Sequence, residues 1–259
     1  MSGPALTIDA VAKTFAAPDG RQVTSIANAT FRVEGGELLA VVGPSGCGKS
    51  TLLNIVAGFL PATAGRVLVD DVAVDGVRGD VGYVFQRDAL LPWKTVLDNV
   101  ALPLVFRRMP RADAQARAAE WIRRVGLGGF ERHYPSQLSG GMRKRVALAT
   151  SLVSEPGVLL LDEPFAALDV QTRLVIEHDL MDIWSRSRMT TIFVTHDLEE
   201  AIVLADRVVL MSAAPSTVTR VLTIPLGRPR HLVESKLDPA FAGLHATLWR
   251  DLAAEVRWP

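Results

Sequence analysis

Cysteine is nearly absent from this sequence: Cys47 is the single cysteine among 259 residues. One cysteine cannot form an internal disulfide, which excludes a disulfide-stabilised secreted scaffold and fits a reducing cytosol. A charge excess is also absent, because 28 lysines and arginines balance 28 aspartates and glutamates. Nucleic-acid-binding proteins usually carry a basic excess that neutralises phosphates, so we expect no nucleic-acid partner.

Long apolar runs are missing as well, and no stretch reaches the ~18–20 residues that a helix needs to span a bilayer. The first four residues lack the charged and then apolar pattern of a secretion signal. We therefore expect any membrane role to depend on other subunits for the spanning segments. With 49% hydrophobic residues, the chain can bury one substantial core, with at most a smaller appended lobe.

A glycine-rich segment follows a short, nearly unbroken apolar run at residues 37–42 and precedes a helix-like run at residues 50–58. Its residues are Gly43, Pro44, Ser45, Gly46, Cys47, Gly48, Lys49, Ser50 and Thr51. Such a loop gathers backbone N–H donors, a lysine cation and a metal-binding hydroxyl around a polyphosphate. A chance match to the bare pattern occurs in roughly one chain of this length in a hundred, so the strand and helix around it decide the interpretation. We predict binding of ATP or GTP with Mg²⁺.

Two adjacent carboxylates, Asp162 and Glu163, follow the apolar run at residues 158–161. Open α/β sheets bind their ligands at the carboxyl ends of their strands. Neighbouring side chains on a strand point to opposite faces, so the two acids should have different roles. We predict that Asp162 binds Mg²⁺ through water and that Glu163 orients or deprotonates the attacking water. The alternative is an ordinary solvated strand end.

Two further polar residues follow apolar runs in the same way. Gln86 comes after residues 81–85, and we expect its amide to reach both Mg²⁺ and water. His196 directly follows the run at residues 191–195, and Asp197 with Glu200 has the spacing of a helix-capping pair. A histidine of this kind is more often structural than catalytic, but its place beside the predicted phosphates favours a functional role.

The segment Ser139, Gly140 and Gly141 precedes a predicted helix whose first turn holds three basic residues, Arg143 to Arg145. Cations at a helix N-terminus oppose the helix dipole, so this arrangement is favourable if an anion such as a γ-phosphate docks there. A serine-capped helix with basic surface residues is the alternative.

The remaining pattern predicts the architecture. Short alternating runs at residues 5–11 and 27–33, with residues 65–70, indicate a small antiparallel sheet. Apolar periodicity predicts helices at residues 111–125 and 170–184, and another from about residue 142. The fold class is therefore α/β: a three-layer P-loop NTPase (RecA-like) core with an N-terminal antiparallel β lobe and an inserted helical subdomain.

Together these motifs resemble the nucleotide-binding subunit of ATP-binding cassette (ABC) transporters, over residues 5–215. The resemblance makes residues 43–51 the Walker A loop, Gln86 the glutamine of the Q-loop, and residues 139–141 the signature. It implies ATP as the nucleotide, with Mg²⁺. It also implies that the whole chain is one ABC ATPase domain.

The resemblance assigns further residues. It makes Asp162 the Walker B aspartate, Glu163 the catalytic glutamate, Asp169 the D-loop residue and His196 the switch histidine. Phe15 occupies the usual place of the aromatic residue that stacks on adenine. A lone phenylalanine near a chain start is more often a core residue, so both interpretations of Phe15 stay open.

The family pattern divides the domain of residues 1–259 into parts. The nucleotide core with its β lobe is expected at about residues 5–86 and 150–222. The helical signature subdomain is expected at about residues 87–149, and a short C-terminal tail at residues 223–259.

The family pattern also implies a head-to-tail dimer, in which Ser139 of one copy reaches the γ-phosphate held by Lys49 of the other. ATP closes such a dimer and hydrolysis reopens it. The motion would drive two transmembrane permease subunits, contacted near Gln86, and a solute-binding protein would take part indirectly. The expected location is the cytoplasmic face of the plasma (inner) membrane, as a peripheral subunit.

Details of the sequence resemble the branch that imports nitrate, sulfonates and taurine. The tryptophan-bearing segment at residues 88–93 is similar to that branch, and so is Met142, where the signature commonly has glutamine. Ala166 stands where the D-loop commonly has serine, which puts one hydrogen bond across the dimer in doubt. The transported solute is not encoded in this chain.

Three other functions remain as alternatives. The first is the ATPase of an exporter or a cell-envelope complex, which the segment after Gln86 disfavours. The second is a non-transport ABC ATPase of DNA repair or ribosomes, which would carry a long coiled coil or a second cassette. The third is a nucleotide-binding regulatory protein that no longer turns over, against which the filled catalytic positions argue.

Overall fold

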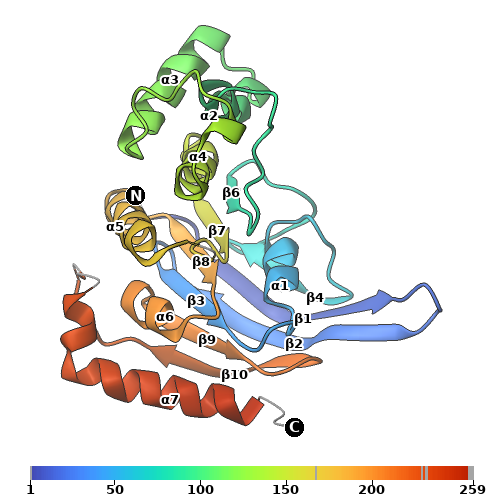
Figure 1. The fold of residues 1–259 in the computed structure, drawn as a ribbon. Helices are drawn as coiled ribbons and strands as arrows, with labels where there is room; N and C mark the ends of the chain where they lie inside the picture. Colours follow the sequence, from blue (N-terminus) through green and yellow to red (C-terminus); the bar gives the residue numbers. More distant parts are fainter. Residues whose placement is uncertain (1, 167, 229, 231–232, 256–259) are drawn as a thin grey trace. The chain divides into compact units, whose positions relative to one another are not determined.

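The structure is a computed structural model that describes residues 2–166, 168–228, 230 and 233–255. The chain forms two compact units. The first unit combines Met1–Arg78 with Arg188–Pro259, and the second unit consists of Gly79–Ser187. Each unit has strands and helices of its own (Figure 1).

The N-terminal part of the first unit is antiparallel, which confirms the predicted β lobe. Strand β1 (Leu6–Ala16) pairs with β2 (Gln22–Val33) on one side and with β4 (Ala64–Val69) on the other. The short β5 (Val72–Ala73) extends the lobe beside β4. Buried residues alternate with more exposed ones along β1, as expected for a sheet with one covered face.

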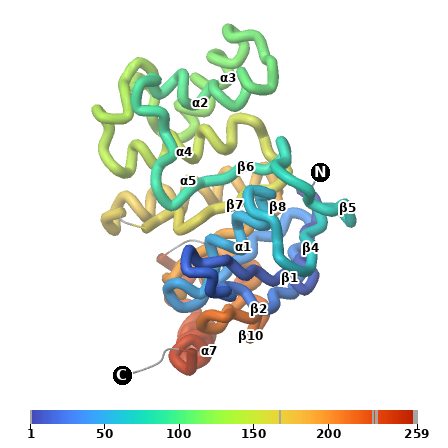
Figure 2. The backbone as a smooth tube through the Cα atoms, turned by 90° about the vertical axis from the view of Figure 1, so that its right-hand side faces the viewer, coloured from blue at the N-terminus to red at the C-terminus, as the bar shows by residue number. Residues whose placement is uncertain are grey.

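The central strands of the first unit are parallel. β3 (Leu38–Val42) lies between β8 (Thr190–Val194) and β9 (Arg207–Met211), and β10 (Ser216–Thr223) runs antiparallel to β9. The strand order in this unit is β5-β4-β1-β2-β10-β9-β3-β8, and Figure 2 shows β1, β2 and β10 in succession. Every residue of β3 and β8 is buried, as in strands that are covered on both faces.

Helices of the first unit follow these parallel strands. α1 (Lys49–Val56) comes after β3, and α6 (Leu198–Leu204) comes after β8 and packs against β3. The 3₁₀ turn η2 (Glu234–Leu237) leads into α7 (Pro239–Glu255), which packs against α6. Because β3 and β8 are parallel neighbours, the N-termini of α1 and α6 lie at the same edge of the sheet.

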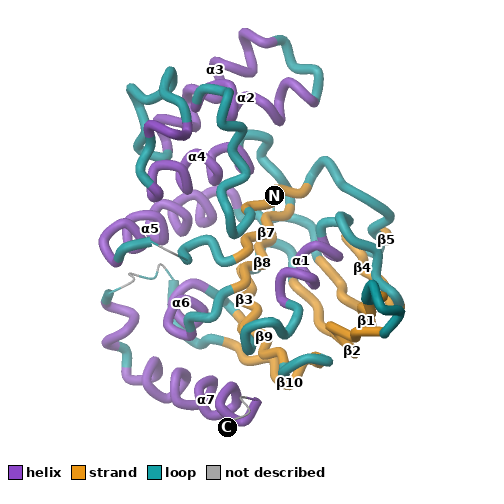
Figure 3. The backbone as a smooth tube through the Cα atoms, turned by 45° about the vertical axis from the view of Figure 1, so that its right-hand side comes forward, coloured by secondary structure: helices purple, strands orange, loops and turns teal. Residues whose placement is uncertain are grey.

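The second unit combines two parallel strands with a group of helices (Figure 3). β6 (Val81–Val84) pairs with β7 (Val158–Asp162). The helical elements are α2 (Val96–Phe106), α3 (Arg111–Arg124), η1 (Pro135–Gln137), α4 (Gly140–Leu152) and α5 (Val170–Ser187). Of these, α4 packs against α2, α3 and α5 and against β6.

The boundaries of the two units differ from the boundaries expected for the subdomains. The helical part was expected at residues 87–149, whereas the second unit also includes β6, β7 and α5. The predicted tail, residues 223–259, contains η2 and α7, and residues 229, 231–232 and 256–259 of it lie outside the described residues. Within the described ranges, no helix combines the length and apolar character that a bilayer crossing requires.

Candidate functional site

The glycine-rich loop lies between β3 and α1, as the pattern predicts. Close packing explains two of its glycines, because a Cβ on Gly43 would lie 2.8 Å from the main-chain oxygen of Met211, and one on Gly48 would lie 2.7 Å from Oγ of Ser25. Gly48 also has a φ of 101°, in the region that favours glycine. The first N–H groups of a helix have no partner within the helix, so this start of α1 is suited to an anion.

Lys49 is buried at the first position of α1, with 6% of its surface exposed. Its Nζ donates hydrogen bonds to the main-chain oxygen of Gly43 at 2.8 Å and to that of Pro44 at 3.0 Å. The loop therefore encloses a cation at the point where a polyphosphate would be cradled. The other predicted residues of the loop and first helical turn are half-buried or exposed: Ser45, Gly46, Ser50 and Thr51.

Cys47 is buried inside the same loop, and burial raises the pKa of its thiol. Little thiolate is then present at pH 7, so we expect thiol reagents to modify the folded chain slowly. Modification should abolish nucleotide binding, because the added group fills the loop. Mass spectrometry of the modified fraction, compared with nucleotide affinity, measures this. Cys47→Ser treated in the same way should keep its affinity, and normal affinity of the fully modified chain would contradict the prediction.

His196 lies in the turn between β8 and α6, at the edge of the sheet where α1 also begins. Thr195 fixes this turn: its Oγ1 donates to Oε2 of Glu200 at 2.6 Å and accepts the N–H of Asp197 at 3.0 Å. Asp197 caps α6 through the N–H groups of Glu199 and Glu200, as predicted, but the Glu200 carboxylate turns to Thr195. His196 is exposed, which argues against a buried structural histidine.

Phe15 lies near the end of β1, and 39% of its surface is exposed. Nζ of Lys13 lies 5.2 Å from the centroid of its ring. This exposure argues against a core role for Phe15. An exposed aromatic ring is what stacking on a base requires.

The two carboxylates of the second unit have different partners. Asp162 ends β7 and is buried, and Oη of Tyr83 donates to its Oδ2 at 3.5 Å. Glu163 follows the strand, and Nε2 of Gln86 donates to its Oε2 at 3.0 Å. Burial and the nearby Asp162 charge raise the pKa of Tyr83, which therefore stays a proton donor. The structure thus brings Gln86 and Glu163 together.

Glu163 has a left-handed backbone, with a φ of 45°. A residue with a Cβ in this region costs roughly 1–2 kcal/mol, and such strain persists where the surrounding structure imposes it. A turn follows directly, because Glu163 accepts the N–H of Ala166 at 3.2 Å. The strained position is a further reason to assign a function to this carboxylate.

Ser139 is the N-cap of α4, and its Oγ accepts the N–H of Met142 at 3.3 Å. A Cβ on Gly141 would overlap Cγ2 of Thr172, near the start of α5. Oδ1 of Asp169 accepts the N–H of Thr172 at 3.0 Å, and hydrogen bonds from Thr172 lower the pKa of Asp169. Gly141 and Asp169 therefore both lie beside Thr172.

The basic residues in the first turn of α4 all have acceptors within the second unit. Arg143 donates to the main-chain oxygen of Leu138, and Arg145 donates to that of Val125. Lys144 donates to the main-chain oxygens of Phe85 and Gln86. An external anion is therefore not needed to account for these cations.

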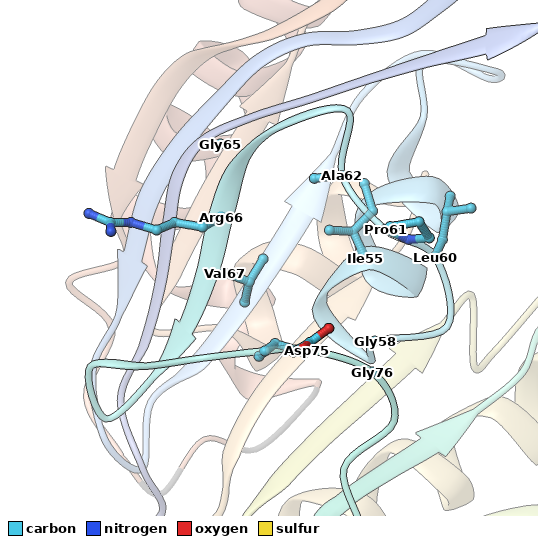
Figure 4. A pocket seen from close by; sticks show the side chains of 11 residues that line it. Ile55, Gly58, Leu60, Pro61, Ala62, Gly65, Arg66, Val67, Asp75 and Gly76 are labelled. Carbon is cyan, nitrogen blue, oxygen red and sulfur yellow. The ribbon is translucent and has the colours of Figure 1, made fainter.

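A cavity of about 330 Å³ lies in the first unit at the C-terminal end of α1. Its lining includes Ile55, Val67, Asp75 and Arg66, and Figure 4 shows the Arg66 side chain extending away from the other lining residues. Lys49 is at the other end of α1. This cavity is therefore not the phosphate loop.

The family of the protein follows from its sequence. The family model for ABC transporters matches residues 26–166. The chain belongs to the ABC transporter family. Its fold agrees, because the dimeric structure of the ABC transporter cassette MJ0796 superposes with a TM-score of 0.77 at 31% identity, covering 86% of this chain and 100% of that one.

Two relatives match this ABC protein over nearly its full length. The taurine import ATP-binding protein TauB of Rhizobium johnstonii is 44% identical over 245 residues, 92% of this chain and 93% of the relative. The nitrate import ATP-binding protein NrtD of Synechococcus elongatus is 43% identical over 242 residues, 92% of this chain and 88% of the relative. The chain is thus an ATP-binding subunit of the ABC type, an ATPase coupled to transport.

The candidate residues of this ABC ATPase divide between its two units. The first unit holds Phe15, the Walker A loop and His196. The second unit holds Gln86, the signature residues, Asp162, Glu163 and Asp169.

The residues predicted to bind the metal offer hard oxygen donors: the hydroxyl of Ser50, the amide oxygen of Gln86 and the carboxylate of Asp162. Mg²⁺ in ATPases is commonly bound by one or two carboxylates together with phosphate oxygens of the substrate, and this donor set is of that kind. Among the described residues, no cluster of three or more His, Cys, Asp or Glu side chains could hold a metal ion by itself.

Sequence reasoning missed Tyr83, Lys144 and the bond between Thr195 and Glu200. Tyr83 reads as one more apolar residue of a buried strand, and Lys144 reads as part of a basic surface turn. One signal could have indicated the contact between Tyr83 and Asp162. Tyr83 lies two residues before the end of the apolar run at residues 81–85, and this end of the strand was expected near the predicted carboxylates.

We expect Gly141→Ala to lower the free energy of unfolding by about 1–3 kcal/mol, because the new Cβ would overlap the stiff, β-branched Thr172. Gly140→Ala is the matched control, since the nearest atom to its Cβ, Nη2 of Arg143, lies at 3.8 Å. Denaturant unfolding of both variants measures the difference. Equal stabilities of the two variants would contradict this account of Gly141.

Proposed function

We propose that this subunit powers the uptake of a small solute of the nitrate, sulfonate or taurine type. The observation that carries the proposal is the near-full-length similarity, at 44% and 43% identity, to ATPases that import taurine and nitrate. Taurine is itself a sulfonate, so both solutes are small and carry an oxyanion group. The solute-binding and permease partners would select among such solutes.

We assign the steps of ATP hydrolysis to residues as follows. Lys49 and the N–H groups of the Walker A loop would hold the phosphates, Ser50 and Asp162 would hold Mg²⁺, and Glu163 would take the proton of the attacking water. The Mg²⁺ ion would neutralise phosphate charge. The hydrogen bond from Gln86 to Glu163, 3.0 Å long, supports the pairing of these two residues in one step.

His196 completes the assignment of the reacting groups. It would contact the γ-phosphate from its exposed turn, which Thr195 and Asp197 hold in place. Phe15 would stack on the adenine base with its exposed ring.

A second copy of the chain is the proposed partner for catalysis. In this arrangement Ser139, Gly140 and Gly141 of one copy would bind the γ-phosphate held by Lys49 of the other copy, and Asp169 would lie near the junction. The dimeric state of the cassette MJ0796 supports this proposal. The dimer would act on two permease subunits at the cytoplasmic face of the membrane.

Neither departure from the family pattern removes a main-chain contact of the site. The N–H of Met142 reaches Oγ of Ser139, a bond that does not depend on the side chain at position 142. The N–H of Ala166 likewise bonds the main-chain oxygen of Glu163. We therefore expect turnover in spite of both departures.

Uptake in the native host tests the function. Deleting the gene for this chain should abolish accumulation of labelled nitrate, taurine or an alkanesulfonate. Expression of the wild-type chain should restore the accumulation, and expression of the Glu163→Gln variant should not. Unchanged uptake of all three solute types would contradict the proposal. Loss of efflux instead would favour the exporter alternative.

A further inference from the structure

Lys144 is a charged side chain in the interior of the second unit, with only 3% of its surface exposed. It belongs to α4, the helix that begins directly after Ser139. Burying an ammonium group is costly unless it is hydrogen-bonded, so a buried lysine needs an explanation. Burial lowers the pKa of Lys144, while the charges of Asp88 and Asp162 oppose that shift.

The ammonium group of Lys144 bonds the main chain of the Q-loop. Its Nζ donates to the oxygen of Phe85 at 3.0 Å and to that of Gln86 at 3.3 Å. The paired register of β6 and β7 ends at Val84 and Leu161. Lys144 therefore bonds carbonyl groups just beyond the last paired residues of β6.

The side chain of Gln86 is held from another direction, because its Nε2 donates to Glu163 at 3.0 Å. Tyr83 shows the same arrangement: Oγ of Ser151 donates to its main-chain oxygen at 2.7 Å, and its own hydroxyl donates to Asp162. Residues seven apart, such as 144 and 151, lie on one face of a helix. One face of α4 thus bonds the main chain of Tyr83 and of Gln86. The side chains of these two residues contact the two carboxylates.

We propose that Lys144 is a positioning residue for hydrolysis, which ties the signature helix to Gln86 and, through Gln86, to Glu163. This inference rests on the proposed function, in which α4 presents Ser139 to the nucleotide of the partner copy. A displacement at the start of α4 would then pull on the main chain of Gln86. Binding of the signature to the partner copy's nucleotide would in this way be coupled to the position of Gln86 and Glu163 in the same chain.

A double-mutant cycle on the full-length chain tests this role. Lys144→Met keeps an unbranched side chain but removes the donor. We expect it to lower kcat for MgATP hydrolysis about tenfold in the wild-type background and less than about twofold in the Gln86→Ala background, because the residue acts through Gln86. The KM for ATP should change less than about threefold in both backgrounds.

Arg107→Met is the control for the cycle. Arg107 also donates to two main-chain oxygens of the second unit, those of Gly79 and Ser154, but it does not bond the Q-loop. Its effect on kcat should be the same with and without Gln86. If Lys144→Met fails to fold, Lys144→Gln, which keeps an N–H donor, takes its place and should show an intermediate loss with the same dependence on Gln86.

The outcomes separate the two proposals. An equal loss of kcat from the Lys144 variant in both backgrounds overturns the positioning role and leaves the proposed function standing. A wild-type chain without ATPase activity, or a Gln86→Ala variant with unchanged kcat, contradicts the assigned chemistry and the positioning role with it. A ¹⁵N signal of the Gln86 side-chain amide that is unmoved in Lys144→Met would also count against the positioning role.

Discussion

A Glu163→Gln variant is expected to bind ATP with wild-type affinity and to hydrolyse it about 10²- to 10⁴-fold more slowly, the range that a general base contributes. Glutamine has the shape of glutamate and keeps an oxygen that can accept the hydrogen bond from Gln86. It cannot take a proton from water. Single-turnover hydrolysis measures the loss, and size-exclusion chromatography with ATP should show an accumulated dimer.

Glu155→Gln is the matched control for this prediction. Glu155 also belongs to the second unit and also has a left-handed backbone, with a φ of 48°. Its carboxylate forms an ion pair with Arg117 at 2.7 Å, and more than half of its side chain is exposed. Turnover of this variant should stay within about twofold of wild type. Wild-type turnover in Glu163→Gln would remove Glu163 from the mechanism.

The elements around the Walker A loop could be predicted because local and tertiary signals agree there. Residues 38–42, which become β3, are apolar at every position, and α1 starts at Lys49 within the glycine-rich segment. The apolar face predicted for the helix at residues 111–125 is buried in α3. In each case one continuous segment carries the whole signal.

α2 was harder to predict because Pro103 lies inside it. Proline has no N–H for the bond within the helix and normally ends a helical pattern. Here the flanking residues Val100, Ala101 and Leu104 are buried, so tertiary packing outweighs the lost bond. Periodicity alone does not reveal such compensation.

The burial of charged side chains could not be predicted either. Arg230 reads as a basic residue of a polar tail, yet it is buried and donates to the main-chain oxygen of Leu226 at 2.9 Å and to that of Ala205. Lys144 is a similar case. Their acceptors are main-chain oxygens, which every residue carries, so no residue type in the sequence marks the partner.

The left-handed backbone of Glu163 is also invisible in the sequence. Positive φ is usually signalled by glycine, asparagine or aspartate, and a glutamate gives no such signal. Motif resemblance identified the residue, whereas its strain and its bond to Gln86 became evident only from the folded second unit.

Lys49→Met should weaken binding of MgATP about 10- to 100-fold, because a hydrogen bond to a charged group contributes roughly 1.5–3 kcal/mol. At saturating ATP, kcat should fall by about 10²-fold or more, since the cation is placed where charge develops on the transferred phosphoryl group. The loop should also loosen, because the oxygens of Gly43 and Pro44 lose their donor. Nucleotide titration and steady-state hydrolysis measure the first two effects, and denaturant unfolding measures the third.

The matched control for Lys49→Met is Lys236→Met, which removes the same charge from the same unit. Lys236 lies on η2 and pairs with Glu199 at the surface, so its loss should leave nucleotide affinity unchanged. Wild-type affinity in Lys49→Met would show that the enclosed ammonium serves only the loop's own carbonyl groups. A parallel loss in both variants would show that overall charge, rather than the position of Lys49, governs the affinity. The enclosed position of Lys49 and the bonds it already makes argue for a loss in Lys49→Met alone.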